Sequence, residues 1–206
     1  MRKQNLFITL IMLLELSRGV RAPPLPFWSF FCHIPILRNG GRIEKAAENL
    51  GVITPSQLHG EWYTIGMTWI RKKPMCSCLI QSFEKPTILA PHGTILQGFI
   101  GCETRKREVN SYLITKNDQN TILKLIYTYR FGPKIFRWNP DIKLDYWIFE
   151  KADDMSWLLV SERCGRRVFI LSRTRVMDPD LYKDLLDRLQ DVYKVNLGRW
   201  TRMCSP

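Results

Sequence analysis

Hydrophobic and polar residues alternate along most of the chain beyond residue 60, and this period of two is that of a β-strand with one buried face. The clearest case lies between residues 121 and 130, where two leucines and two tyrosines alternate with lysine, threonine and arginine. Turn signals separate eight such segments, which predict strands at 60–70, 77–84, 94–102, 107–115, 121–130, 142–150, 155–162 and 167–173. Because the intervening turns are short, neighbouring strands are expected to pair as antiparallel hairpins.

The pattern changes to a helical spacing near the end of the chain. Asp178-Pro179 combines an N-cap with a proline in the first turn, and apolar residues then recur three to four positions apart at Leu181, Leu185, Leu189 and Val192. This predicts an amphipathic helix that packs against the strands. Residues 44–50 predict a short helix ended by Gly51, and Thr54-Pro55 predicts one further helical turn.

The first residues have the order of a secretory signal peptide: two basic residues, a short apolar stretch and then small residues. The apolar stretch is too short to span a bilayer, and cleavage after Gly19 is expected. The domain organisation predicted is a signal peptide over 1–19, an irregular, proline-rich segment over 20–53 and one domain over 54–206.

Two short motifs frame the strands. Leu58-His59-Gly60-Glu61-Trp62-Tyr63 precedes them, and Ile170-Leu171-Ser172-Arg173-Thr174 ends them. Together with the order of elements, these motifs resemble the sequence marks of the lipocalin family. The resemblance implies an all-β fold: an eight-stranded up-and-down antiparallel barrel with a C-terminal helix packed on its side. Tyr146-Trp147-Ile148 and Trp157-Leu158-Leu159-Val160 make the chain most similar to the branch of apolipoprotein D and the bacterial lipocalins, although Ala152-Asp153-Asp154 departs from the usual Thr-Asp-Tyr.

In such a barrel the first and last strands meet at the closed end, so Trp62 and Arg173 are expected to be adjacent. A guanidinium over an indole face stabilises by roughly 0.5–2 kcal/mol. Gly60 lets the entering backbone approach closely where a side chain would clash. These three roles are structural.

The alternation also indicates which side chains face the barrel interior. The residues predicted to contact a ligand are Leu123, Leu125, Tyr127, Tyr129, Leu144, Tyr146 and Ile148. The alternative is that the same side chains simply fill the barrel.

The formal net charge is +12 at pH 7. Many of the basic residues fall in loops that strand direction places at the open end of the barrel: Arg71, Lys72, Lys73, Arg105, Lys106, Lys134, Arg137, Arg163, Arg166 and Arg167. A positive rim around an apolar interior favours an amphiphile with an anionic head, such as a fatty acid, a lysophospholipid, a retinoid acid or a bilin. The alternative is that these are ordinary solvated loop residues.

Six cysteines in a secreted chain of this length indicate disulfides. Cys76-Ser77-Cys78 does not have metal-site spacing and the three histidines are scattered, so no metal and no cofactor are expected. Similarity to apolipoprotein D implies the bridges Cys32–Cys164 and Cys78–Cys204, with Cys76 and Cys102 able to pair. An alternative bridge, Cys102–Cys204, would leave a thiol such as Cys76 free, in a segment that resembles the nucleophile site of lipocalin-type prostaglandin D synthase.

The sequence therefore predicts a secreted, extracellular carrier that is not an enzyme and that binds a small hydrophobic ligand. Its expected partners are that ligand and a cell-surface receptor; no nucleic acid and no transmembrane segment are expected. Two alternatives stay open: a thiol-dependent isomerase acting through Cys76, and a polyanion-binding extracellular protein.

Overall fold

The computed structural model describes residues 38–68, 77–87, 94–102, 105–115, 120–128, 141–162 and 165–204. The chain divides into two compact units, Met1–Ile34 and Pro35–Pro206, and all described residues belong to the second. The predicted signal peptide and the first part of the predicted N-terminal segment thus lie outside the described residues.

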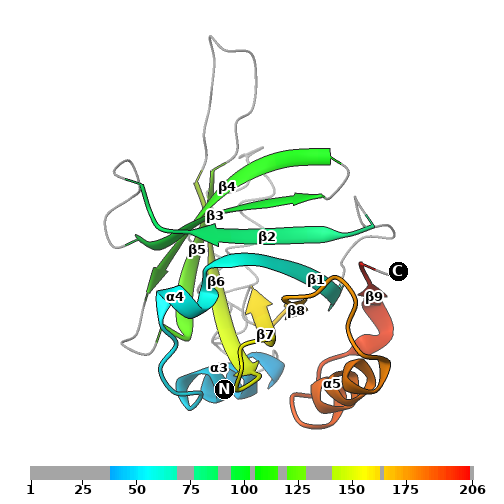
Figure 1. Ribbon diagram of the computed structural model, residues 1–206. Coiled ribbons are helices and arrows are strands. Elements are labelled where there is room, and N and C mark those ends of the chain that lie inside the picture. Colours follow the sequence, from blue (N-terminus) through cyan, green and yellow to red (C-terminus); the bar gives the residue numbers. More distant parts are fainter. Residues whose placement is uncertain are drawn as a thin grey trace, which may run out of the picture. The chain divides into compact units, whose positions relative to one another are not determined.

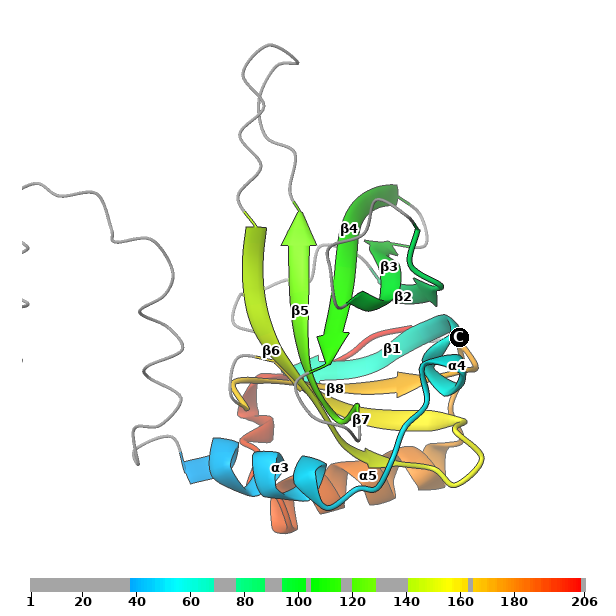
Figure 2. The same cartoon turned by 90° about the vertical axis from the view of Figure 1, so that its left-hand side faces the viewer.

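Eight strands follow one another in the second unit, all close to their predicted positions. They are β1 (Gly60–Thr68), β2 (Leu79–Glu84), β3 (Thr94–Cys102), β4 (Arg105–Thr115), β5 (Ile122–Thr128), β6 (Asp141–Lys151), β7 (Trp157–Glu162) and β8 (Arg167–Ser172). Each strand from β2 to β7 is hydrogen-bonded to the next, and β1 pairs antiparallel with both β8 and β2 (Figures 1 and 2). The predicted eight-stranded up-and-down barrel is confirmed.

The predicted C-terminal helix is also present, as α5 (Pro179–Asp191). The carboxylate of Asp178 caps it by accepting hydrogen bonds from the backbone N–H groups of Asp180 and Leu181. Its buried face consists of Tyr182, Leu185 and Leu189. The prediction was wrong for Val192, which is 58% exposed because the helix ends one residue earlier.

A ninth strand, which the sequence pattern did not predict, continues the barrel wall beyond α5. A short 3-10 helix, η2 (Leu197–Arg199), leads into β9 (Trp200–Arg202). β9 pairs with β1 at Gly66, Met67 and Thr68, beyond the part of β1 that pairs with β2. Gly66 is required there, since a Cβ at this position would lie 2.6 Å from the Trp200 ring.

Helix α3 (Arg38–Glu48) begins earlier than the helix predicted from residue 44. Gly40 and Gly41 favour a turn by local propensity, but the helix backbone packs closely at this point: a Cβ on Gly165 would lie 3.1 Å from the Cα of Gly40. Ile43 and Ala47 are fully buried, and α3 packs against β5 and β6. The predicted turn after Thr54 forms α4 (Pro55–Leu58), which leads into β1.

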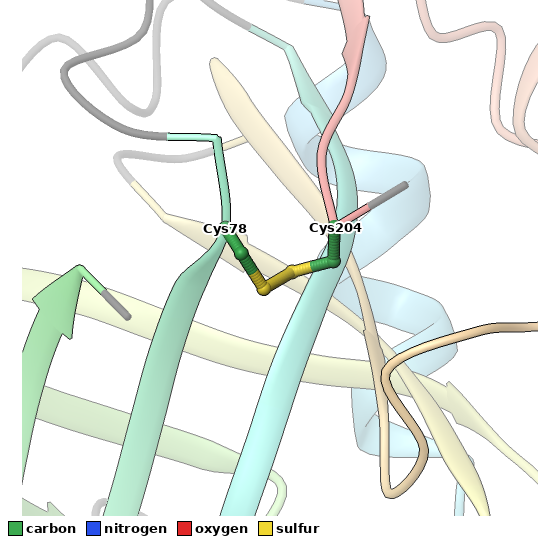
Figure 3. The surroundings of a disulfide bond; sticks show 2 residues. All are labelled: Cys78 and Cys204. Carbon is green, nitrogen blue, oxygen red and sulfur yellow. A yellow bond between two sulfur atoms is a disulfide. The ribbon is translucent and has the colours of Figure 1, made fainter. Parts of the chain in front are cut away.

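A disulfide joins Cys78, just before β2, to Cys204, just after β9 (Figure 3). This is the bridge that similarity to apolipoprotein D implied. The alternative Cys102–Cys204 bridge was wrong because Cys204 is bonded to Cys78, and Cys102 is itself disulfide-bonded. The implied Cys32–Cys164 bridge and the alternative nucleophile Cys76 lie outside the described residues. None of the helices in the described ranges is long and apolar enough to cross a bilayer.

Candidate functional site

One hydrogen bond crosses the interior of the barrel. The hydroxyl of Tyr146 donates to Oε1 of Gln81 over 3.2 Å, and both side chains are buried. Tyr146 is the middle residue of β6 and Gln81 lies in the middle of β2, and these two strands are not neighbours in the sheet. A direct bond between opposite walls requires that both side chains point inward.

Strand register extends this orientation to the neighbouring strands, because directly paired residues lie on the same face of a sheet. Tyr146 pairs with Leu123 and Leu144 pairs with Leu125, so these residues share the inner face, and Ile148 follows two positions further along β6. The predicted orientation of this part of the wall agrees with the register. The side chain of Tyr127, and Tyr129 as a whole, lie outside the described residues.

The inward-facing residues differ in burial along the barrel. We call the end at which β1 begins the closed end and the opposite end the open end. Near the closed end the inner face is fully buried, at Phe83, Leu96, Leu113, Leu123, Leu158 and Leu171. Towards the open end Leu79, Ile100 and Leu144 are only partly buried. Partial exposure of apolar side chains on the inner face is therefore found in the open half, at Leu79, Ile100 and Leu144, although Met67 and Phe169 in the same half are buried.

An ion pair lies on the inner face near the open end. Glu162, at the end of β7, pairs across the sheet with both Tyr146 and Arg167, so its side chain also points inward. It is only 2% exposed, and its Oε2 lies 3.6 Å from Nη1 of Arg167. Arg167 was predicted as one of the positive charges at the rim; it is partly buried and lies in an ion pair with Glu162.

The environment of Tyr146 fixes its protonation. Burial, and to a lesser degree the negative charge of Glu162, raise the pKa of Tyr146 well above its ordinary value. The phenol therefore stays protonated at physiological pH and acts as a hydrogen-bond donor inside the barrel.

Most of the other predicted rim charges cannot be placed. Arg166 is exposed beside Arg167. Arg105 and Lys106 begin β4, but their side chains are outside the described part of the structure. The described part of the structure does not include Arg71, Lys72, Lys73, Lys134, Arg137 and Arg163.

The closed end is held by the two motif residues. The guanidinium carbon of Arg173 lies 3.7 Å from the centroid of the Trp62 ring, and Trp62 is fully buried. Arg173 also donates to the carbonyl oxygens of Glu61 and Gln57 over 3.1 and 2.7 Å, and its partial burial lowers its pKa. Trp62 in turn donates from Nε1 to the carbonyl of Leu58 over 2.9 Å.

Gly60 makes this arrangement possible. Its φ of +96° is in the left-handed region that favours glycine, and a Cβ on it would lie 3.2 Å from Nη1 of Arg173. The two motifs, which lie more than a hundred residues apart in the sequence, thus meet at the closed end, as the sequence predicts.

A family model described as a lipocalin-like domain matches residues 55–201. The chain belongs to the lipocalin family. No curated protein matches.

Several solved structures are similar at low identity. Insecticyanin from the tobacco hornworm Manduca sexta has 12% identity and a TM-score of 0.49, with 75% of this chain and 82% of insecticyanin covered. Lobster apocrustacyanin A1 has 13% identity and a TM-score of 0.48, with 72% and 77% covered.

Sequence reasoning missed Gln81 and Glu162 as interior residues. Each is a polar residue in a short strand, and its polarity alone indicates a position that faces solvent. Glu162 pairs directly with Tyr146 on the adjacent strand, and this pairing places its side chain inside the barrel. The pairing follows from the strand register, which the sequence pattern alone does not give.

Proposed function

We propose that this protein is an extracellular carrier, not an enzyme, that binds a small hydrophobic ligand in the open half of its barrel. The observation that supports this most directly is the change in burial along the inner face. Apolar side chains near the closed end are fully buried, whereas Leu79, Ile100 and Leu144 present apolar surface that stays partly accessible. Burying such surface against a hydrophobic ligand is favourable by about 25 cal/mol per Å².

The finer proposal is that the ligand is an amphiphile with an anionic head, such as a fatty acid, a lysophospholipid, a retinoid acid or a bilin. The net charge of +12 and the exposed Arg166 support it, while the pairing of Arg167 with Glu162 weakens the contribution of that one residue. The positive rim would attract the head and steer capture. A neutral sterol that binds more tightly than a fatty acid would contradict this proposal.

Secretion is part of the same proposal. We infer that residues 1–19 are removed as a signal peptide, that 20–53 precede the barrel domain of 54–206, and that a cell-surface receptor is a further partner. The buried disulfide between Cys78 and Cys204 supports an oxidising environment. Placement in the branch of apolipoprotein D and the bacterial lipocalins rests on the motifs in β6, β7 and β8, together with this disulfide.

A bulky substitution in the accessible half tests the location of the ligand. Leu144→Trp adds an indole on the inner face, and we expect it to weaken binding of palmitic acid at least about tenfold by occupying the ligand's space. Isothermal titration calorimetry measures the effect.

The matched control is Ile114→Trp. Ile114 is also partly buried, but it is adjacent in β4 to the inward-facing Leu113 and therefore lies on the outer face. This variant is expected to bind like the unmodified protein. Equal loss in both variants would mean that the ligand is not bound where we propose.

A further inference from the structure

The inner face of the barrel carries a third polar feature, the buried hydroxyl of Thr64. The Thr64 side chain is fully buried, and among the described residues its Oγ1 has no hydrogen-bond partner. A buried polar group of this kind costs free energy unless something satisfies it.

Register places this hydroxyl inside the barrel. Trp62 pairs directly with Gln81, whose side chain reaches across the interior to Tyr146, so Trp62 and Gln81 share the inner face. Thr64 lies two positions beyond Trp62 and pairs with Leu79 and Leu171. It therefore shares the same face and is a diagonal neighbour of Gln81, at a typical Cα separation of about 7–8 Å.

Three polar side chains thus occupy the boundary between the filled half and the accessible half of the barrel. Gln81 accepts from Tyr146 through Oε1, and this bond does not use the two N–H donors of its amide. Thr64 offers a hydroxyl that can both donate and accept. The surrounding inward-facing residues, such as Leu79 and Leu125, offer neither.

We propose that Thr64, Gln81 and Tyr146 form a polar layer that binds a neutral oxygen group, a hydroxyl or a carbonyl, at the buried end of an otherwise hydrophobic ligand. This inference rests on the proposed carrier function and specifies the ligand further. A ligand that enters from the open end meets this layer before the fully buried closed half.

The negative charge of Glu162 favours a neutral group over an anionic one at the polar layer. Glu162 lies directly across the sheet from Tyr146 on the inner face, where its Oε2 is 3.6 Å from Nη1 of Arg167. A ligand carboxylate brought beside it would lose hydration and meet a like charge. The anionic head therefore stays at the open end, and a neutral oxygen group reaches the polar layer.

The test compares fatty acids that differ only at the far end. Palmitic acid and its ω-hydroxy derivative, and likewise lauric acid and its ω-hydroxy derivative, are titrated into the full chain with its disulfides intact. At the chain length whose far end reaches the polar layer, the ω-hydroxy acid is expected to bind about tenfold more tightly than the plain acid. This is the effect of one satisfied hydrogen bond at a buried site. In an interior without the layer the hydroxyl would instead weaken binding, because its desolvation is not compensated.

Thr64→Val and Gln81→Leu are expected to abolish or reverse this preference, measured in each variant as the ratio of the dissociation constants of the plain and the hydroxy acid. Thr64→Val has a second signature: its melting temperature without ligand should rise, because it removes an unsatisfied buried hydroxyl at nearly constant shape.

Ser161→Ala is the matched control. Its Oγ is also fully buried and without a partner among the described residues, but Ser161 is adjacent to the inward-facing Glu162 and lies on the outer face. Its melting temperature should rise as well, while the preference for the ω-hydroxy acid stays unchanged.

Three results would overturn the inference. If the unmodified protein binds the plain acids as tightly as the hydroxy acids, the polar layer has no role and the carrier function still stands. If Thr64→Val and Gln81→Leu both keep the preference, the hydroxyl is bound elsewhere. If neither kind of acid binds at any length, the proposed ligand class fails and this inference fails with it.

Discussion

At the scale of single residues, the contact between Arg173 and Trp62 is the most directly testable feature. Arg173 stacks on the indole at 3.7 Å and donates to two carbonyl oxygens of the segment that leads into and begins β1. One side chain therefore connects the end of β8 to the start of the barrel. Its neighbour Trp62 provides the largest of the fully buried side chains.

Trp62→Ala is expected to lower the free energy of unfolding by about 3–5 kcal/mol, because it removes a large buried ring. Arg173→Met is expected to cost less, and the double variant should cost about 0.5–2 kcal/mol less than the sum of the two single variants. Urea unfolding followed by circular dichroism measures all three. Strict additivity would show that the stacked pair contributes nothing beyond the separate packing of its members.

The orientation of side chains could be predicted where polar and apolar residues alternate regularly and one face of the strand is exposed to solvent. Leu123, Leu125 and Tyr146 were oriented correctly because lysine, threonine and aspartate mark the outer face of β5 and β6. Thr64, Gln81 and Glu162 were not found, because a polar residue on the inner face breaks the rule on which that reasoning depends. Their orientation follows only from register and from the bond between Tyr146 and Gln81.

At the scale of elements, strands and helices approach one another most closely where one of them carries a glycine. Gly98 in β3 pairs with Phe83 in β2, and a Cβ on Gly98 would lie 2.2 Å from the carbonyl oxygen of Ser82. The carbonyl belongs to the paired strand and cannot move away without disturbing the β2–β3 ladder. A side chain at this position is thus incompatible with the sheet as it stands.

Gly98→Ala is expected to destabilise the protein by about 1–3 kcal/mol through this overlap. Gly41→Ala is the matched substitution in α3, where a Cβ would meet nothing within 4 Å, and it should stabilise by up to about 1 kcal/mol through helix propensity. Thermal unfolding of both variants checks the two signs. A stabilised Gly98→Ala variant would mean that β2 and β3 are not paired in this register.

Helices and strands could be predicted from the sequence where the local pattern of hydrophobic and polar residues determines them. The eight strands and α5 were located within a few residues, whereas the early start of α3 and the presence of β9 were not found. Gly40 and Gly41 indicate a turn locally, yet both lie in the helix, where Gly165 approaches the backbone of Gly40 closely. β9 is only three residues long, too short for its pattern to be recognised, and it packs where Gly66 leaves room for Trp200, whose Nε1 donates to the hydroxyl of Tyr182 on α5.

At the scale of the whole molecule, the disulfide connects the start of β2 with the segment after β9 across 126 residues of sequence. It fixes the C-terminal strand beside β1, where Cys204 also donates its backbone N–H to the carbonyl of Ser77 over 2.8 Å. In the unfolded chain the same bond closes a long loop, so it restricts the unfolded ensemble strongly.

Replacing both Cys78 and Cys204 by alanine should lower the free energy of unfolding by about 2–5 kcal/mol. Urea denaturation is the appropriate measurement, with each single variant as a control that loses the same bond. A double variant as stable as the unmodified protein would indicate that the C-terminal segment is held by β9 pairing alone.

For the function of the whole molecule, the sequence predicts the protein family but not the ligand. The motifs around Trp62 and Arg173 predict the barrel, and the family match over residues 55–201 confirms it. The ligand cannot be predicted in the same way, because the chemistry of the interior depends on which few polar side chains point inward. Among the described residues these include Thr64, Gln81, Tyr146, Glu162 and Arg167, which come from five different strands.

Native mass spectrometry of the protein isolated from its own cells and their medium tests most directly whether the barrel carries a small hydrophobic molecule. We predict a species heavier than the disulfide-bonded polypeptide by one small molecule, which organic extraction releases and which contains a hydrophobic body with at least one oxygen group. A native mass equal to that of the bare polypeptide, with nothing recovered in the extract, would contradict the carrier function.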